Sequence, residues 1–212
     1  SQAVTINIRD TDPNITGPSG SAGASSSSKY INENTTAVHT FTANETVTWS
    51  LNGGDDASKF SINSSTGALT FNSPPDYESA TDWDAGNDYI VVVRATDSEG
   101  YTSDQTVEVS IVNTTPVITG PSGNPGDFTS SKAINENTTA VHTFTSDESV
   151  TWSLGYNNGY DYQKLSIHSS TGALTFNSPP DYEGGKTTYT FNVIATDTSG
   201  RQSSQAVTIN LR

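Results

Sequence analysis

The stretch TGALTFNSPPDYE occupies residues 66–78 and recurs without a single change at residues 171–183. We expect a strand over residues 68–71, followed by an extended Pro-Pro step. Side chains two residues apart point to the same side of an extended chain, so Asp76 and Glu78 should face one direction. Two carboxylates on one side are suited to a hard cation such as calcium.

The duplication continues on both sides of this stretch. INENTTAVHTFT at 31–42 returns at 134–145, and VTWSL at 47–51 returns at 150–154, which sets a period of about 100 residues. Solenoid units are shorter, so we expect two tandem domains, 10–112 and 113–212. Residues 1–9 nearly duplicate the last strand of the second repeat, so we interpret them as the last strand of a preceding repeat in a longer chain.

Apolar residues alternate with polar ones inside each repeat, as Val47, Trp49 and Leu51 do. This pattern predicts half-buried strands, and no stretch keeps a helical period. Turn residues separate the strands at the spacing of an Ig-like sandwich, whose core Trp49 and Trp152 should fill. The serine-rich run 21–28 is expected to be a flexible loop. Seven strands are predicted in the first repeat: 29–32, 36–42, 47–51, 59–62, 68–71, 89–95 and 105–112.

Composition limits the partners. The chain has 212 residues, a formal net charge of −14 and a pI near 4.2, so nucleic acid and anionic membranes are poor partners. It has no Cys, which removes disulfides, thiolate zinc sites and Cys nucleophiles. No apolar run is long enough for membrane insertion. Abundant Ser, Thr and Asn are typical of secreted bacterial adhesive repeats.

Three motifs in a fixed order carry a family resemblance: NEN at 32–34, DYE at 76–78 and ATDSEG at 95–100. The repeats resemble the cadherin domain in its bacterial cadherin-like form. The resemblance implies an all-β fold of two tandem seven-stranded Greek-key, cadherin-like β-sandwiches. It also implies calcium (Ca2+) ligands at the matching positions. These are Glu33, Asp76, Glu78 and Asp97 in the first repeat, and Glu136, Asp181, Glu183 and Asp197 in the second.

Two family motifs are reduced. The linker reads RDTDP at 9–13 and VNTTP at 112–116, and the Asp-x-Asp after the second strand is replaced by TANE at 42–45 and TSDE at 145–148. Family members commonly bind two or three calcium ions per junction, so we expect fewer or weaker ions here. The expected central site joins Glu33, Asp76 and Glu78 with Asn113, Asp197 and Asp147 or Glu148. An upper site would use Asp10, Asp12 and Asp97, and a lower one Glu136, Asp181 and Glu183.

Two further features admit alternatives. DWDAGND at 82–88 is similar to a calcium loop but lacks the closing Glu of an EF-hand, so an exposed acidic turn is favoured. Trp83 could be a sugar platform or a hydrophobic anchor of that loop. Tyr156, Tyr160 and Tyr162 could stack on sugars or cap the open end of the sandwich.

We therefore predict a calcium-binding extracellular adhesion or spacer module of a large repetitive bacterial surface or secreted protein. Calcium would stiffen the junction between neighbouring repeats, and the partner would be a cell-surface protein or a polysaccharide. The alternative is a carbohydrate-binding module. Catalysis is not expected, because no nucleophile–base set, phosphate loop or zinc spacing is visible.

Overall fold

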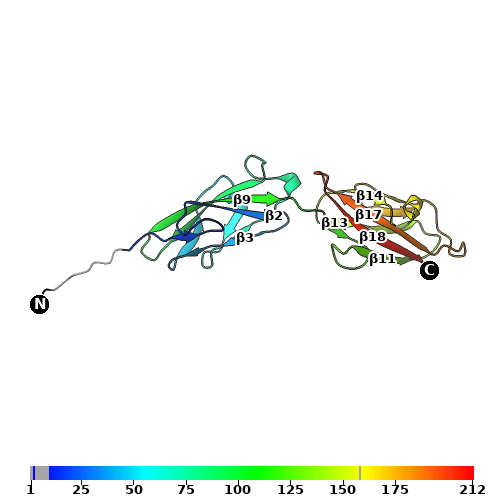
Figure 1. The fold of residues 1–212 in the computed structure, drawn as a ribbon, viewed down its shortest axis with the longest axis horizontal. Coiled ribbons are helices and arrows are strands. Elements are labelled where there is room, and N and C mark those ends of the chain that lie inside the picture. The colour runs from blue at the N-terminus through cyan, green and yellow to red at the C-terminus, as the bar shows by residue number, and fades with distance from the viewer. Residues whose placement is uncertain (1, 3–9, 158) are drawn as a thin grey trace. The chain divides into compact units, whose positions relative to one another are not determined.

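The structure is a computed structural model that describes residues 2, 10–157 and 159–212. The strand predicted for residues 1–9 therefore lies outside the described residues, apart from Gln2. The chain divides into two compact units, 1–113 and 114–212, which we call the first and second units (Figure 1).

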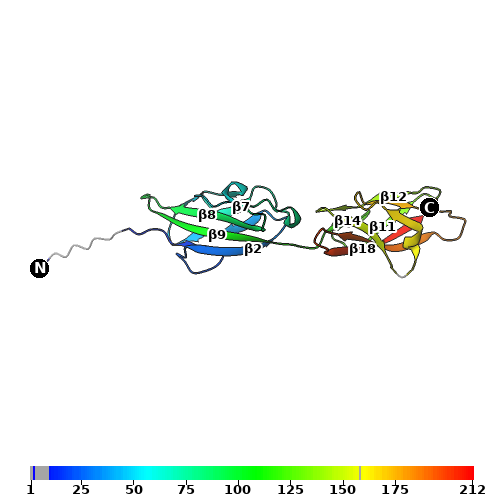
Figure 2. The same ribbon diagram turned by 90° about the horizontal axis from the view of Figure 1, so that it is seen from above.

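Two sheets face each other in the first unit. The larger has the order β2-β9-β8-β5, and the smaller has the order β3-β7-β6, with β1 paired to β4. Figure 2 shows β2, β9 and β8 running side by side. The strands are β1 (Ile15–Thr16), β2 (Ser26–Asn32), β3 (Ala37–Thr40), β4 (Thr42–Ala43), β5 (Thr48–Leu51), β6 (Phe60–Ile62), β7 (Ala68–Phe71), β8 (Asp88–Thr96) and β9 (Thr102–Val112). Short 3-10 turns, η1 (Ala57–Lys59) and η2 (Tyr77–Ser79), lie in the connections.

Strict alternation along the long strands builds the core. Tyr89, Val91 and Val93 on β8 are buried, while the residues between them are half-buried. Trp49 is only 5% exposed and its ring lies 5.9 Å from that of Phe41. The prediction that Trp49 and Trp152 fill the cores is confirmed. The all-β fold class is confirmed as well.

The strand β2 begins earlier than expected. Residues 26–28 pair in parallel with β9, so the prediction of a flexible loop through residue 28 is wrong for its last part. The reason is a buried polar contact: Ser27 Oγ donates to Gln105 Oε1 at 3.0 Å, and Gln105 Nε2 donates to the Ala24 carbonyl at 2.8 Å. Gln105 is fully buried, so the chain beside it must supply partners for its amide.

The strand predicted at 36–42 is divided into β3 and β4. The register shifts between Ala37 and His39, and the Phe41 N–H donates to the Gly67 carbonyl at 2.9 Å. Phe41 itself turns fully into the core. The chain therefore changes partner at Phe41. β3, before Phe41, pairs with β7, and β4, after it, pairs with β1.

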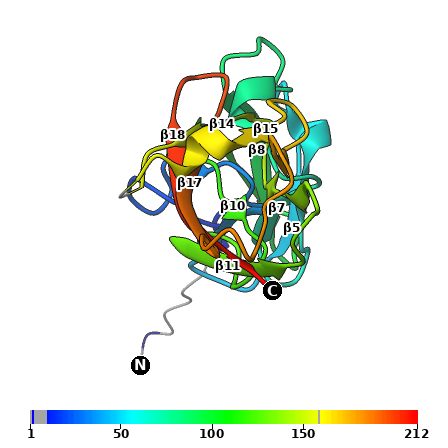
Figure 3. The same ribbon diagram turned by 90° about the vertical axis from the view of Figure 1, so that its right-hand side faces the viewer.

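The second unit repeats this plan with the sheet orders β11-β18-β17-β14 and β12-β16-β15, and with β10 paired to β13. β11 and β18, far apart in sequence, lie side by side as a parallel pair (Figure 3). The elements are β10 (Ile118–Thr119), β11 (Thr129–Ile134), β12 (Ala140–Thr143), β13 (Thr145–Ser146), β14 (Thr151–Gly155), η3 (Asp161–Lys164), β15 (Leu165–Ile167), β16 (Ala173–Phe176), β17 (Thr188–Thr196) and β18 (Gln202–Leu211).

Strand ends gather the loops of each unit at two poles. In the first unit, the end of β4, the start of β5 and the turn after β8 form what we call the N-terminal pole. The end of β2, the end of β9 and the loop between β7 and β8 form the C-terminal pole. Within the described part of the chain, no helix is long and apolar enough to cross a membrane.

Candidate metal centre

Asp97 lies at the N-terminal pole of the first unit, where three backbone N–H groups hold its side chain. It lies in the tight turn between β8 and β9 and is 8% exposed. Its Oδ1 accepts hydrogen bonds from the N–H groups of Glu99 (2.9 Å), Gly100 (2.7 Å) and Tyr101 (2.9 Å). Its other oxygen, Oδ2, is buried and has no hydrogen-bond partner among the described residues. Burying a carboxylate oxygen without a partner costs free energy, so a bound cation at Oδ2 would stabilise the fold.

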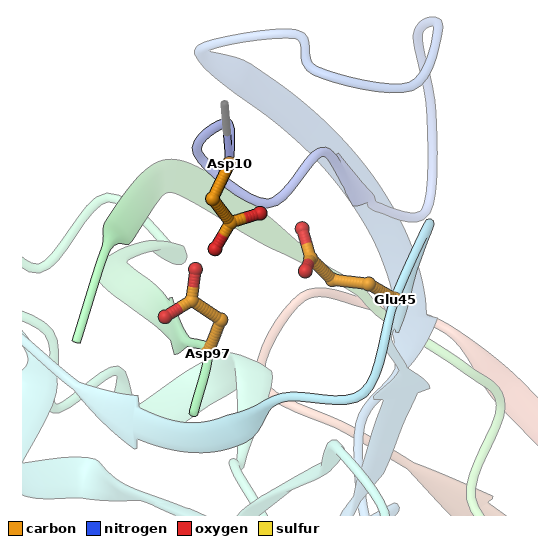
Figure 4. Close-up of side chains that lie close together, drawn as sticks. All are labelled: Asp10, Glu45 and Asp97. Carbon is orange, nitrogen blue, oxygen red and sulfur yellow. The ribbon is translucent and has the colours of Figure 1, made fainter. Parts of the chain in front are cut away.

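Two more carboxylates face Asp97. Asp10 comes from the segment before β1 and Glu45 from the link between β4 and β5, and the three side chains point toward one another (Figure 4). Each offers an oxygen, and these oxygens all lie within 4.8 Å of one another. Three elements distant in sequence thus place three negative charges around one point.

The electrostatics of this group favour a cation. Desolvation, followed by the charges of Asp10, Asp97 and Glu99, raises the pKa of Glu45 above its usual value. Like charges at such short separation disfavour ionisation, and a divalent cation would reverse that effect. Carboxylate oxygens are the ligands of calcium, which takes six to eight oxygens in flexible geometry. Backbone carbonyls and water would complete such a shell.

The sequence predicted part of this group. Asp10 and Asp97 are brought together as expected, whereas Asp12 is exposed and belongs to no such group among the described residues. Glu45 was not among the predicted ligands, because it ends the segment TANE at 42–45, which departs from the family pattern. Its acidic equivalent in the second repeat, Glu148, was the available signal.

The C-terminal pole of the first unit collects Glu33, Asp76, Glu78 and Asn113. Glu33 Oε2 accepts the Tyr77 N–H at 3.1 Å, and oxygens of Glu33 and Glu78 lie within 4.8 Å of each other. Asn113 Nδ2 donates to Glu78 Oε1, while Asn113 Oδ1 is buried and has no hydrogen-bond partner among the residues that the structure describes. Asp76 Oδ1 accepts the Glu78 N–H at 3.0 Å. Among the described residues, Asp76 joins no group of three carboxylates.

The second unit repeats this arrangement at its own C-terminal pole. Glu136, Asp181 and Glu183 offer oxygens within 4.8 Å of one another. Glu136 Oε2 accepts the Tyr182 N–H at 2.8 Å, as Glu33 does with Tyr77. The two DYE motifs thus share two contacts: the tyrosine N–H donates to the glutamate of the NEN motif, and the glutamate N–H donates to the aspartate of its own motif.

At the N-terminal pole of the second unit, Asp197 is 5% exposed. Its Oδ1 accepts the Arg201 N–H at 2.7 Å, and its Oδ2 has no hydrogen-bond partner among the described residues. Asp147 holds the backbone before β10, because its Oδ1 accepts the Val117 N–H at 2.7 Å. Its equivalent Asn44 holds the Asn14 N–H in the same way, at 2.6 Å. The geometry of the first unit therefore favours Glu148, the equivalent of Glu45, over Asp147 as the ligand.

The loop at 82–88 differs from its prediction. Asp82 is 7% exposed, so an exposed acidic turn is wrong for this residue. Trp83 is 80% exposed, so it does not anchor the loop. The backbone explains both, because the Trp83 N–H donates to buried Asp56 and thereby turns the indole outward.

The tyrosines of the second unit do not form one flat surface. The rings of Tyr156 and Tyr160 are inclined by 63°, and those of Tyr160 and Tyr162 by 44°. Tyr162 packs against the core, whereas Tyr156 and Tyr160 are exposed. The capping alternative therefore fits Tyr162, and no coplanar platform for a sugar ring exists among these three rings.

Comparison with known proteins finds a family similarity in the first repeat. Residues 30–112 match the family profile described as Cadherin domain. No curated protein matches the chain.

Solved structures that are similar to the chain include Drosophila N-cadherin EC1-3, with 16% identity over 96% of this chain and 68% of that one, and a TM-score of 0.41. They also include human CDH23 EC21-23, with 18% identity over 95% of this chain and 70% of that one, and a TM-score of 0.41.

Proposed function

We propose that the chain is a calcium-binding adhesion or spacer module of a repetitive extracellular protein, because residues 30–112 match the Cadherin domain profile. Cadherin domains are extracellular adhesion modules that bind calcium, and they are generally not enzymes. The bacterial surface setting, the role of calcium in stiffening successive repeats and the residues that bind it are parts of this proposal.

The observation that carries the proposal is the group of Asp10, Glu45 and Asp97. The Asp97 carboxylate is buried and held by three N–H groups, yet one of its oxygens is left without a hydrogen-bond partner. The Asp97 carboxylate faces two further carboxylates, and oxygens of the three residues lie within 4.8 Å of one another (Figure 4). Such an arrangement costs stability until a cation occupies it, and a hard divalent ion suits an all-oxygen ligand set.

We extend the proposal to the other poles by repeat equivalence. Asp197 and Glu148 correspond to Asp97 and Glu45, and Glu33, Asp76 and Glu78 correspond to Glu136, Asp181 and Glu183. Calcium at these poles would order the links on either side of a sandwich. A chain of sandwiches stiffened in this way could hold an adhesive partner away from a cell surface.

Thermal unfolding in calcium and in EDTA tests the proposal. Extracellular modules bind calcium with Kd of about 0.1–1 mM. At about 10 mM calcium, each occupied site should therefore stabilise the fold by about 1.4–2.7 kcal/mol. The melting temperature should rise by roughly 5–20 °C relative to EDTA. Equal melting temperatures in both buffers would refute calcium binding.

Glu45→Gln sharpens the test, since it removes one charge from the group of Asp10, Glu45 and Asp97 and keeps the size of the side chain. It should leave the melting temperature in EDTA unchanged or raise it, because a repulsive charge is removed. In calcium it should reduce the gain. Glu108→Gln, on an exposed position of β9, is the matched control and should keep the full calcium response.

A further inference from the structure

The second unit contains an ion pair between Asp161 and Lys186. Asp161 in η3 forms an ion pair with Lys186, whose Nζ lies 2.7 Å from Oδ1, and Asp161 Oδ2 accepts the Thr190 N–H at 3.0 Å. The Asp161 side chain is only 16% exposed, so its charge needs a partner. Lys186 is supplied by the short link GGKTT at 184–188.

The first unit has the same acid but no such lysine. Asp56 is the equivalent of Asp161 and is 3% exposed. Its two oxygens accept the N–H groups of Trp83 and Ile90, each at 2.8 Å. The link that follows, SATDWDAGND at 79–88, is five residues longer than GGKTT and is acidic. No Lys or Arg occurs anywhere between Lys59 and Arg94.

The longer link adds a second buried carboxylate, that of Asp82. Asp82 precedes the residue that binds Asp56, and it is 7% exposed. Its Oδ2 accepts the Gly86 N–H at 2.8 Å, and its Oδ1 is buried with no hydrogen-bond partner in the described chain. Neither acid forms an ion pair within the described part of the chain, and Asp82, unlike Asp56, keeps one buried oxygen unsatisfied. A buried charge is costly unless it is paired or bound to a metal.

Two further oxygens belong to the same loop. Asp84 Oδ1 accepts the same Gly86 N–H at 3.2 Å, so the carboxylates of Asp82 and Asp84 converge on one hydrogen. Asn87 Nδ2 donates to the Tyr77 carbonyl at 2.9 Å, which fixes the orientation of the amide. Asn87 Oδ1 is then a buried acceptor without a partner among the described residues.

We propose that the loop 82–88 is a second kind of divalent-cation site, present only in the first unit, with Asp82, Asp84 and Asn87 as ligands. A calcium ion there would bring positive charge to this acidic loop, whereas in the second unit Lys186 brings it directly to Asp161. The ligand set is hard and all-oxygen, two charges and one amide, which selects calcium over softer metals. The few charged ligands place its affinity at the weak end, with Kd on the order of 1 mM.

Nuclear magnetic resonance on the full chain tests this site residue by residue. Calcium, added alone as the chloride up to about 10 mM, should shift the Gly86 and Asn87 amide resonances along a saturable curve. Asp84→Asn should weaken the affinity read from these resonances at least about tenfold, since a charged ligand is lost. Asp84 is exposed, so this variant does not disturb the core. Asp55→Asn, an exposed acid before η1, is the control and should leave the curve unchanged.

A second variant imitates the other unit. Asp84→Lys supplies a cation within the loop, so it should abolish the calcium response of Gly86. Glu45→Gln should not alter that response, which separates this site from the one at the N-terminal pole. The proposal is overturned if Gly86 does not respond to calcium, if the affinity is unchanged in Asp84→Asn, or if the response survives in Asp84→Lys.

Discussion

Replacing Gly17 with alanine should damage the first unit through one buried hydrogen-bond network. A Cβ at this position would lie 1.9 Å from Gln105 Oε1 and 2.7 Å from Ser27 Oγ. The Gln105 side chain is fully buried and cannot move into solvent. The added methyl must therefore break the contact from Ser27 Oγ and the one from Gln105 Nε2 to the Ala24 carbonyl.

The magnitude follows from these contacts. Each orphaned buried polar group costs about 1–3 kcal/mol, and overpacking a filled site costs about 1–3 kcal/mol. Since the network can relax in part, we expect Gly17→Ala to lower the free energy of unfolding by about 3 kcal/mol. In a unit of this size that is a fall in melting temperature on the order of 15 °C.

Calorimetry of a double-mutant cycle isolates the cause. In a Gln105→Ala background the obstructing amide is gone, so adding Gly17→Ala should cost under about 1 kcal/mol. Gly120→Ala should behave like Gly17→Ala in the second unit, where its Cβ would lie 2.0 Å from Gln205 Oε1. Gly159→Ala, which meets nothing within 4 Å, is the control. A cost that stays unchanged when Gln105 is removed would refute this reasoning.

Two predictions remain. Asp76→Asn should reduce calcium binding in titration calorimetry more than Asp181→Asn does, because the guanidinium of Arg212 donates to Asn135 Oδ1 and so brings a positive charge beside Glu136 at the pole of Asp181. Equal losses would contradict this. Burial, followed by the charge of Lys29, lowers the pKa of His39 below 6.5. The unfolded chain then binds the proton more tightly, so stability is complete above pH 6.5 and declines as the pH falls below it. His39→Gln should flatten this decline in urea unfolding measured from about pH 7 to 5, and an unchanged slope would assign the pH dependence to other groups.

The sequence by itself determined the repeating all-β plan and part of the metal centre. The alternation of apolar and polar residues along a strand reflects which side chains are buried on folding. It therefore predicted the buried faces of β8 and β9 and the core position of Trp49. The motif around Asp97 is local, because its Oδ1 binds N–H groups within four residues. Such features can be read from adjacent residues.

Only the tertiary structure decided the features that depend on distant partners. Residues 26–28 form a strand because Gln105 and β9, far along the chain, provide hydrogen bonds for them. Glu45 joins Asp97 because two strand ends meet at one pole, although the local motif departs from the family pattern. Asp82 is buried because Asp56 binds the N–H of the next residue. The local sequence shows which type of side chain stands at a position. Whether that side chain is buried, and which charged groups lie beside it, depends on contacts with segments far away in the sequence.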